Sequence, residues 1–80
     1  GADSSIKPED VHKIFGSFIA LDEKVKQDWD PYAPLGPEDR PAAFGKILMC
    51  ALILCVEALP KGGTARIQGD GPTAVLITAE

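Results

Sequence analysis

The sequence contains little of several residue types, and each scarcity excludes a class of protein. Two cysteines in 80 residues are too few for a small domain held together by disulfides. Eight basic side chains face 12 acidic ones, and the net charge of -4 argues against a general nucleic-acid binder, which needs a basic surface. The longest apolar run, Ile47–Val56, is too short to span a membrane, which takes about 20 residues. We therefore expect neither a nucleic-acid partner nor a membrane partner.

The remaining composition is that of a folded protein. Apolar residues make up 45% and charged residues 25%, so the chain is expected to form one small globular domain. Most acidic side chains lie in residues 1–40 and most apolar ones in residues 41–80, so the second half is expected to supply the core. Because 80 residues are few for independent stability, and because a strand pattern runs almost to Glu80, we expect the chain to be part of a longer domain.

The first segment predicts a linker and a helix. Residues 1–7, which open with small and polar side chains, are predicted to be a linker. A helix is predicted over residues 8–21, because proline suits the first helical position and acidic residues follow it at the positive end of the helix dipole. Apolar residues recur there with helical spacing, which predicts a stripe packed on one side. The stripe consists of Val11, Ile14, Phe15 and Phe18, and Ile19 and Leu21 widen it.

The next segment predicts a short strand followed by a connector. Over residues 23–29, Val25, Gln27 and Trp29 alternate with charged side chains, as in a strand with one exposed face. Residues 30–41 contain four prolines and predict an extended connector without regular structure.

A second helix is predicted over residues 42–59, directly after Pro41. It carries only two charged side chains and is apolar on almost every side, which predicts the buried central helix of the fold. The segment Pro60–Gly63 ends it, because proline cannot continue a helix and glycine accepts the left-handed conformation that often follows one.

Two strands complete the predicted fold. Ala65 and Ile67 alternate with polar residues over 64–68, a turn follows at 69–72, and residues 73–79 are rich in β-branched side chains. The order helix, strand, helix, strand, strand predicts an α+β fold of two layers. Both helices are expected on one face of a small, mostly antiparallel sheet.

The single histidine and the two cysteines are the first candidates for chemistry. His12 lies at the flank of the apolar stripe without an acidic neighbour to orient its ring, and is predicted to be a surface or boundary residue. Cys50 and Cys55 point about 140° apart on one helix, so they can neither share a metal nor form a disulfide. We expect both to be buried, reduced thiols. Together with the lack of a secretory signal pattern, this predicts a cytoplasmic protein.

Glycine-rich and acidic segments are weaker candidates. Gly62–Gly63 follows a helix and Gly69–Gly71 joins two strands, whereas a phosphate-binding loop lies between a strand and a helix. Four acidic residues could hold a divalent cation, but their spacing matches no known loop, so a solvated surface is expected. We assign no catalytic, cofactor-binding or metal-binding residue, and expect no cofactor and no catalysis by this chain alone. The acidic residues are Asp22, Glu23, Asp28 and Asp30.

The segment Gly45–Gly69 resembles the C-terminal domain of bacterial histidine phosphotransferases, which relay phosphate in two-component signal transduction. The most specific part is Glu57–Thr64, where a long helix ends in Glu-Ala-Leu-Pro-Lys-Gly-Gly-Thr before two strands. Residues 8–30, with Asp28-Trp29, resemble the helix and short strand that precede it in the family. The resemblance covers nearly the whole chain, and it implies a partial, truncated C-terminal domain over residues 8–80.

The resemblance implies a fold similar to part of a histidine-kinase ATP-binding domain that has lost its nucleotide site. Cys50 stands where such helices commonly carry an asparagine that helps bind magnesium and ATP phosphates, and a thiol suits softer metals. The parent family is dimeric and carries its phosphorylated histidine on an N-terminal helical hairpin. His12 matches the first helix of the C-terminal domain instead, so no catalytic residue is carried over.

The resemblance also implies partners, namely the receiver domains of response regulators and of a hybrid histidine kinase. We therefore expect a phosphotransferase fragment that gives structural support and docks receivers without binding ATP. Lys13, Lys24 and Lys26 are the candidate docking residues, because they could meet an acidic receiver rim; a solvated face is the alternative for them. The alternative function is a small interaction or dimerisation module unrelated to phosphorelay, with Ile47–Val56 in the interface helix. Residual ATP binding is a third hypothesis.

Overall fold

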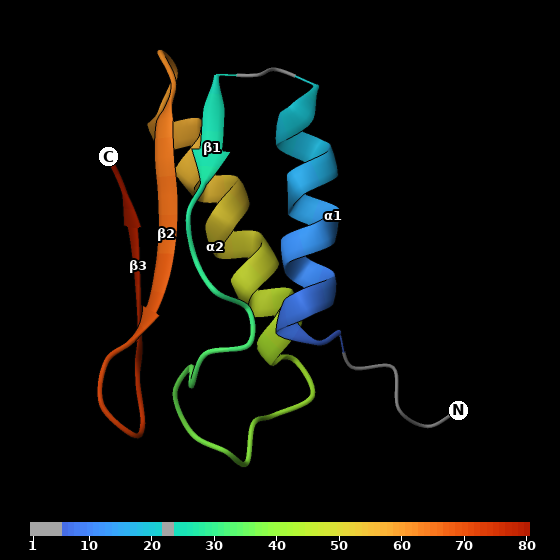
Figure 1. Ribbon diagram of the computed structural model, residues 1–80, viewed down its shortest axis with the longest axis vertical. Coiled ribbons are helices and arrows are strands. Elements are labelled where there is room, and N and C mark those ends of the chain that lie inside the picture. The colour runs from blue at the N-terminus through green and yellow to red at the C-terminus, as the bar shows by residue number, and fades with distance from the viewer. Residues whose placement is uncertain (1–5, 22–23) are drawn as a thin grey trace.

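The structure is a computed structural model that describes residues 6–21 and 24–80. It contains two helices and three strands in the predicted order (Figure 1), so the α+β class is confirmed. In chain order the elements are α1 (Pro8–Ala20), β1 (Val25–Gln27), α2 (Phe44–Ala58), β2 (Gly63–Gly69) and β3 (Val75–Ala79).

The three strands form one mixed sheet in the order β1-β2-β3. β1 runs parallel to β2, with Val25 opposite Gly63, and β2 runs antiparallel to β3, with Ile67 opposite Ile77. The parallel pair is possible because α2 lies in the connection between its strands and returns the chain to the same end of the sheet. The antiparallel ladder is the longer one, which confirms the prediction of a mostly antiparallel sheet.

Both helices cover the same face of the sheet, as predicted. Figure 1 shows α1 beside β1 and α2 behind the strands. Side chains alternate along each strand, so Val25, Ala65 and Ile67 are buried toward the helices, whereas Lys26 and Arg66 lie on the opposite face. One face of the sheet therefore belongs to the core, and the other is polar.

The core fills the space between the sheet and the two helices. Phe15 and Leu52 are fully buried at its centre. Leu35 is also fully buried, although it comes from the proline-rich connector, so this segment folds back over the core instead of merely joining two elements. The buried apolar set is Val11, Phe15, Ile19, Val25, Trp29, Leu35, Leu48, Leu52, Cys55, Ala65 and Ile67.

α1 begins where the sequence predicts. Pro8 occupies its first position, and the Asp10 carboxylate accepts the backbone N–H of Lys7 at 3.3 Å, which satisfies a donor near the start of the helix. The helix ends at Ala20, one residue earlier than predicted. Ile6 falls within the segment predicted as a linker, yet its side chain packs against the core.

The predicted apolar stripe of α1 is partly wrong. Val11, Phe15 and Ile19 are buried, but Ile14 is 49% exposed and Phe18 is 45% exposed. α1 contacts both α2 and β1, so the buried row is the one that faces the space between these two elements. The other two residues form a neighbouring apolar row at the surface.

α2 is slightly shorter than predicted and is not buried on all sides. It runs from Phe44 to Ala58 within the predicted 42–59, because the two alanines before it lie in a turn. Ile47 is 58% exposed and Leu54 is 63% exposed, so the prediction of a fully covered central helix is wrong. One companion helix and a small sheet cover a single side of α2. Among the described residues, neither helix is long and apolar enough to cross a membrane.

The strands differ from the prediction mainly at their ends. β1 forms only three ladder residues, although the alternation of buried and exposed side chains continues to Trp29, and residue 23 lies outside the described residues. β3 begins at Val75 rather than residue 73. The preceding residues belong to the hairpin loop, where the Asp70 N–H donates to the carbonyl oxygen of Ala74 at 2.9 Å.

Two glycines permit close backbone contacts that hold the elements in place. Gly62 has a φ of 96°, and a Cβ atom there would lie 2.6 Å from the carbonyl oxygen of Lys24. A Cβ atom on Gly45 would collide with the carbonyl oxygen of Ile6. Glycine therefore lets the turn after α2 pack on the start of β1, and lets the N-terminal segment pack on the start of α2.

Replacing Phe15 with alanine tests the position of the core. Loss of a fully buried ring is expected to cost about 3–5 kcal/mol of unfolding free energy. Because the core of so small a domain supplies about 3–5 kcal/mol in total, Phe15→Ala should abolish cooperative urea unfolding followed by circular dichroism. Phe18→Ala on the same helix is the control, and it should stay folded and lose about 1 kcal/mol or less. Equal losses from the two variants would contradict the observed buried row.

Candidate docking surface

A chain of hydrogen bonds fixes α1 against β1. The side-chain amide of Gln27 donates from Nε2 to the carbonyl oxygen of His12 at 2.8 Å. Its Oε1 accepts the indole N–H of Trp29, also at 2.8 Å. Gly16 keeps α1 close, since a Cβ atom there would lie only 3.0 Å from Nε2. One half-buried amide thus joins the helix to the strand, in a place where an unpaired polar group would be costly.

The imidazole of His12 belongs to the same contact. His12 is half-buried, and its ring meets the indole of Trp29 edge-on, with the ring centroids 5.1 Å apart. Such aromatic pairs stabilise a packed boundary. The half-buried position agrees with the predicted boundary residue, and the ring serves to pack α1 on the segment after β1.

A groove of about 510 Å³ lies beside this contact, between α1 and β1. Gly16, Lys26 and Gln27 are among the residues that line it. Lys13 lies one turn before Gly16 on the same side of α1, and Lys24 stands exposed just before β1. Of the three candidate docking lysines, the structure places Lys26 in the lining of this groove, while Lys13 and Lys24 are exposed on or next to the two elements that bound it. We call this groove, together with the exposed Lys13, Lys24 and Lys26 of the elements that bound it, the α1–β1 surface.

An apolar pocket of about 290 Å³ lies on the other side of α1, near its C-terminal end. It is lined by Phe18, Ile19, Leu21, Val25 and Val56, and it shares Ile19 and Val25 with the groove. Leu21 is 86% exposed, so the prediction that it widens the buried stripe is wrong. An apolar patch beside a charged rim has the composition of a protein-binding surface.

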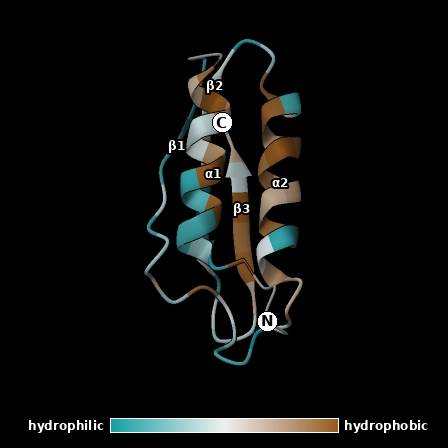
Figure 2. Ribbon diagram, turned by 90° about the vertical axis from the view of Figure 1, so that its right-hand side faces the viewer, coloured by the Kyte–Doolittle hydropathy of each residue, from teal (hydrophilic) through white to brown (hydrophobic). Residues whose placement is uncertain are grey.

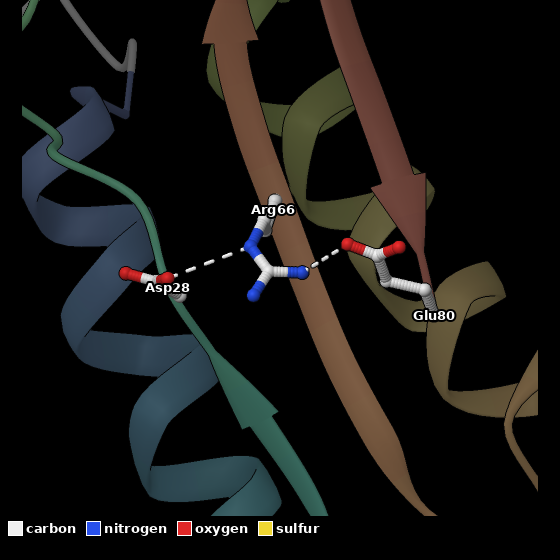
Figure 3. Close-up of polar contacts among 3 residues, drawn as sticks. All are labelled: Asp28, Arg66 and Glu80. Atoms are coloured by element: carbon white, nitrogen blue, oxygen red, sulfur yellow. Dashed lines mark hydrogen bonds and ion pairs between the residues drawn. The ribbon is translucent and has the colours of Figure 1, made fainter.

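The opposite face of the sheet carries a charged cluster (Figure 3). The Arg66 guanidinium lies between two carboxylates, with its Nε 3.4 Å from Asp28 Oδ2 and its Nη1 hydrogen-bonded to Glu80. All three side chains are partly or largely exposed, so each ion pair contributes only about 0–1 kcal/mol. The cluster ties the ends of β1 and β3 to β2 and has a structural role.

The acidic residues considered as cation ligands do not converge where the structure describes them. Asp28 pairs with Arg66, and Asp30 accepts the backbone N–H of Tyr32 at 2.9 Å within a turn. Asp22 and Glu23 lie outside the described residues. Across residues 6–21 and 24–80, no group of three or more His, Cys, Asp or Glu side chains is arranged to hold a metal ion.

The two glycine segments lie in turns. Gly62–Gly63 joins α2 to β2, and the backbone N–H of Gly63 donates to the carbonyl oxygen of Lys24 at 3.1 Å. Gly69–Gly71 ends β2 and enters the hairpin loop before β3. Neither segment lies between a strand and a following helix, where phosphate-binding loops are found.

The two thiols have different environments. Cys55 is buried as predicted, and burial raises its pKa. Cys50 is exposed, so the prediction that both thiols are buried is wrong. Five residues on one helix place the side chains on different sides, and α2 buries one side only. Cys50 therefore lies in the open apolar face of α2.

Gln27 holds this region together through its hydrogen bonds, although its sequence position did not mark it as a candidate. The alternating pattern places it on the inner face of β1, between the apolar Val25 and Trp29. A neutral amide between apolar residues on the inner face of a strand indicates a hydrogen-bonding role, because its donor and its acceptor both need partners there.

The chain matches a known family over nearly its whole length. The family model of the histidine phosphotransferase C-terminal domain matches residues 8–80. The match starts at the first residue of α1 and includes every helix and strand of the described residues. Neither a curated protein nor a solved structure matches the chain.

Replacing Gln27 with leucine tests the link between α1 and β1. The change leaves the buried indole N–H of Trp29 without its acceptor, which is expected to cost about 1–3 kcal/mol of unfolding free energy in urea titrations. Gln27→Glu retains an acceptor for the indole but replaces the Nε2 donor with an oxygen that faces the His12 carbonyl, so it should also lose stability. Gln68→Leu, at an exposed position of β2, is the control and should change stability by about 0.5 kcal/mol or less. A native-like stability of Gln27→Leu would contradict this role.

Thiol labelling tests the placement of the two cysteines. In dilute native protein, Cys50 should react with a disulfide reagent at the rate of an accessible thiol. Cys55 should react at least about 100-fold more slowly, because it is buried and its raised pKa reduces the thiolate fraction. Cys50→Ser should remove the fast phase, and urea should release the slow one. Fast reaction of both thiols in the folded protein would contradict this arrangement.

Proposed function

Because the chain belongs to the histidine phosphotransferase C-terminal domain family, we propose that it serves a phosphorelay as a docking domain and not as the site of phosphate chemistry. Its proposed partners are the receiver domains of response regulators and of a hybrid histidine kinase. The observation that carries the proposal is the α1–β1 surface. Lys26 lines its groove, and Lys13 and Lys24 are exposed on or next to α1 and β1, in a protein of net charge -4.

Electrostatics explains why these lysines would matter. A receiver presents a phosphorylatable aspartate within an acidic rim, and an acidic protein repels such a surface in general. A local group of lysines would fix where the rim approaches and would raise the association rate. The neighbouring pocket at Phe18 and Leu21 offers apolar area that a partner can bury. The Gln27 hydrogen bonds hold α1 and β1 in one arrangement, which lowers the ordering cost of binding.

The proposal includes no nucleotide. The exposed side of α2 presents Ile47, Cys50 and Leu54, and hydrocarbon and thiol groups are poor ligands for magnesium bound to phosphates. This supports the loss of the nucleotide site that the resemblance implies, and it speaks against residual ATP binding. The family match also favours phosphorelay over a module unrelated to it. We place this function in the cytoplasm, within a dimeric parent protein.

Charge reversal on the α1–β1 surface tests the docking proposal. Isothermal titration would measure binding to purified receiver domains of response regulators from the same genome. Lys13→Glu/Lys26→Glu is expected to lower the affinity about 100-fold, because like charges facing each other cost several kcal/mol and about 1.4 kcal/mol corresponds to tenfold. Native binding should weaken as salt rises, and the variant should show less of this dependence.

Lys46→Glu is the matched control, since it makes the same charge change on α2, away from the groove. It should leave receiver affinity within about twofold of native. Equal affinity of native protein and the double variant would contradict docking at the α1–β1 surface. If no receiver domain binds the native chain, the docking function itself is wrong.

A further inference from the structure

The side of α2 that points away from the sheet is an unpartnered apolar face. In Figure 2, α2 is mainly brown, with hydrophilic teal near each end. Ile53 and Leu54 are 38% and 63% exposed, which is far more than a core helix allows. A shallow, almost wholly apolar groove of about 330 Å³ runs along this face. Its lining residues are Lys46, Ile47, Cys50, Ala51 and Leu54.

Two charges of opposite sign mark the ends of this face. Lys46 and Glu57 are exposed, and neither forms an ion pair with another of the described residues. With 3.6 residues per turn, the series Lys46, Cys50, Ile53 and Glu57 lies within about 60° around the axis and spans about 16 Å along it. The stripe is therefore positively charged at its N-terminal end, apolar in the middle and negatively charged at its C-terminal end.

We propose that the open face of α2 binds a second copy of this chain, with the two α2 helices antiparallel across a two-fold axis. A two-fold axis that passes between the two helices, level with the midpoint of Cys50 and Ile53, is also level with the midpoint of Lys46 and Glu57. It places Lys46 opposite Glu57 of the second copy, twice by symmetry, and Cys50 opposite Ile53 of the second copy. A symmetric contact requires this kind of self-complementary surface.

The residue sizes suit such a contact. Cys50 is small and lies near the centre of the stripe, so the helix axes can approach to about 8–10 Å, while Ile47 and Leu54 lie together along one flank of it. One helix face buries less area than a standard interface, so we expect a weak dimer that forms as concentration rises. The contact is separate from the receiver-docking proposal, because it uses α2 and leaves the α1–β1 surface free.

A charge-swap cycle tests the contact, with sedimentation equilibrium of the 80-residue chain as the measurement. Lys46→Glu and Glu57→Lys each turn two attractive pairs into repulsive ones and should raise the dimer dissociation constant at least about tenfold. The double variant restores both pairs with reversed sign and should return within about threefold of native. Both changes suit the dipole of α2, so the helix should persist in circular dichroism.

Replacing an exposed apolar residue of α2 with a polar one gives a second test of the contact. Leu54→Gln should abolish the dimer, whereas Leu76→Gln, at a 43% exposed position on β3, should leave it intact. Labelling of Cys50 should slow as protein concentration rises in the native chain, and should not do so in Leu54→Gln. A chain that stays monomeric at every concentration, or a double variant as weak as the singles, would overturn the proposal. Loss of the dimer in Lys46→Glu with native receiver affinity would separate this contact from docking.

Discussion

The rest of this structure depends on how much of α2 the chain can cover. α2 is apolar around most of its circumference, but the chain sets against it only α1 and a three-stranded sheet. Leu48, Leu52 and Cys55 turn toward these elements, and the opposite side remains at the surface. Exposed apolar area costs about 25 cal/mol per Å² relative to buried area, so any surface that covers this side gains free energy. The exposed apolar residues of α2 are therefore the ones that a contact on this side would bury.

The same constraint decides which row of α1 is buried. α1 must contact α2 and β1 together, and the row of Val11, Phe15 and Ile19 meets both. Packing alone leaves α1 free to slide along β1, and the directional hydrogen bonds of Gln27 to His12 and Trp29 remove that freedom. The groove at the α1–β1 surface is thus bounded by two elements that these hydrogen bonds hold together, which would favour the proposed docking.

Local patterns in the sequence were enough to predict the helices and strands, but not to predict which side of each helix is buried. Period-two and period-3.6 spacing, with proline and glycine at the ends, locates both helices and all three strands to within a few residues. The prediction of the buried side of α1 was partly wrong because apolar residues occupy two neighbouring rows. Ile14 and Phe18 fit a helical stripe as well as the buried residues do. Only the positions of α2 and β1 select between the rows. The prediction that Cys50 is buried was wrong for a related reason, since composition does not show how many elements pack against a helix.

The candidate site was predictable in part for the same physical reason. Spacing alone does not show that the elements next to Lys13, Lys24 and Lys26 are neighbours, yet α1 and β1 are consecutive in the chain, and consecutive elements usually lie side by side. Family resemblance supplied the kind of partner, and geometry supplied the surface that would receive it. That surface lies on the side of α1 toward β1, whereas the open apolar face lies on α2. A partner on one therefore does not cover the other, so docking and self-association can proceed independently in the same molecule.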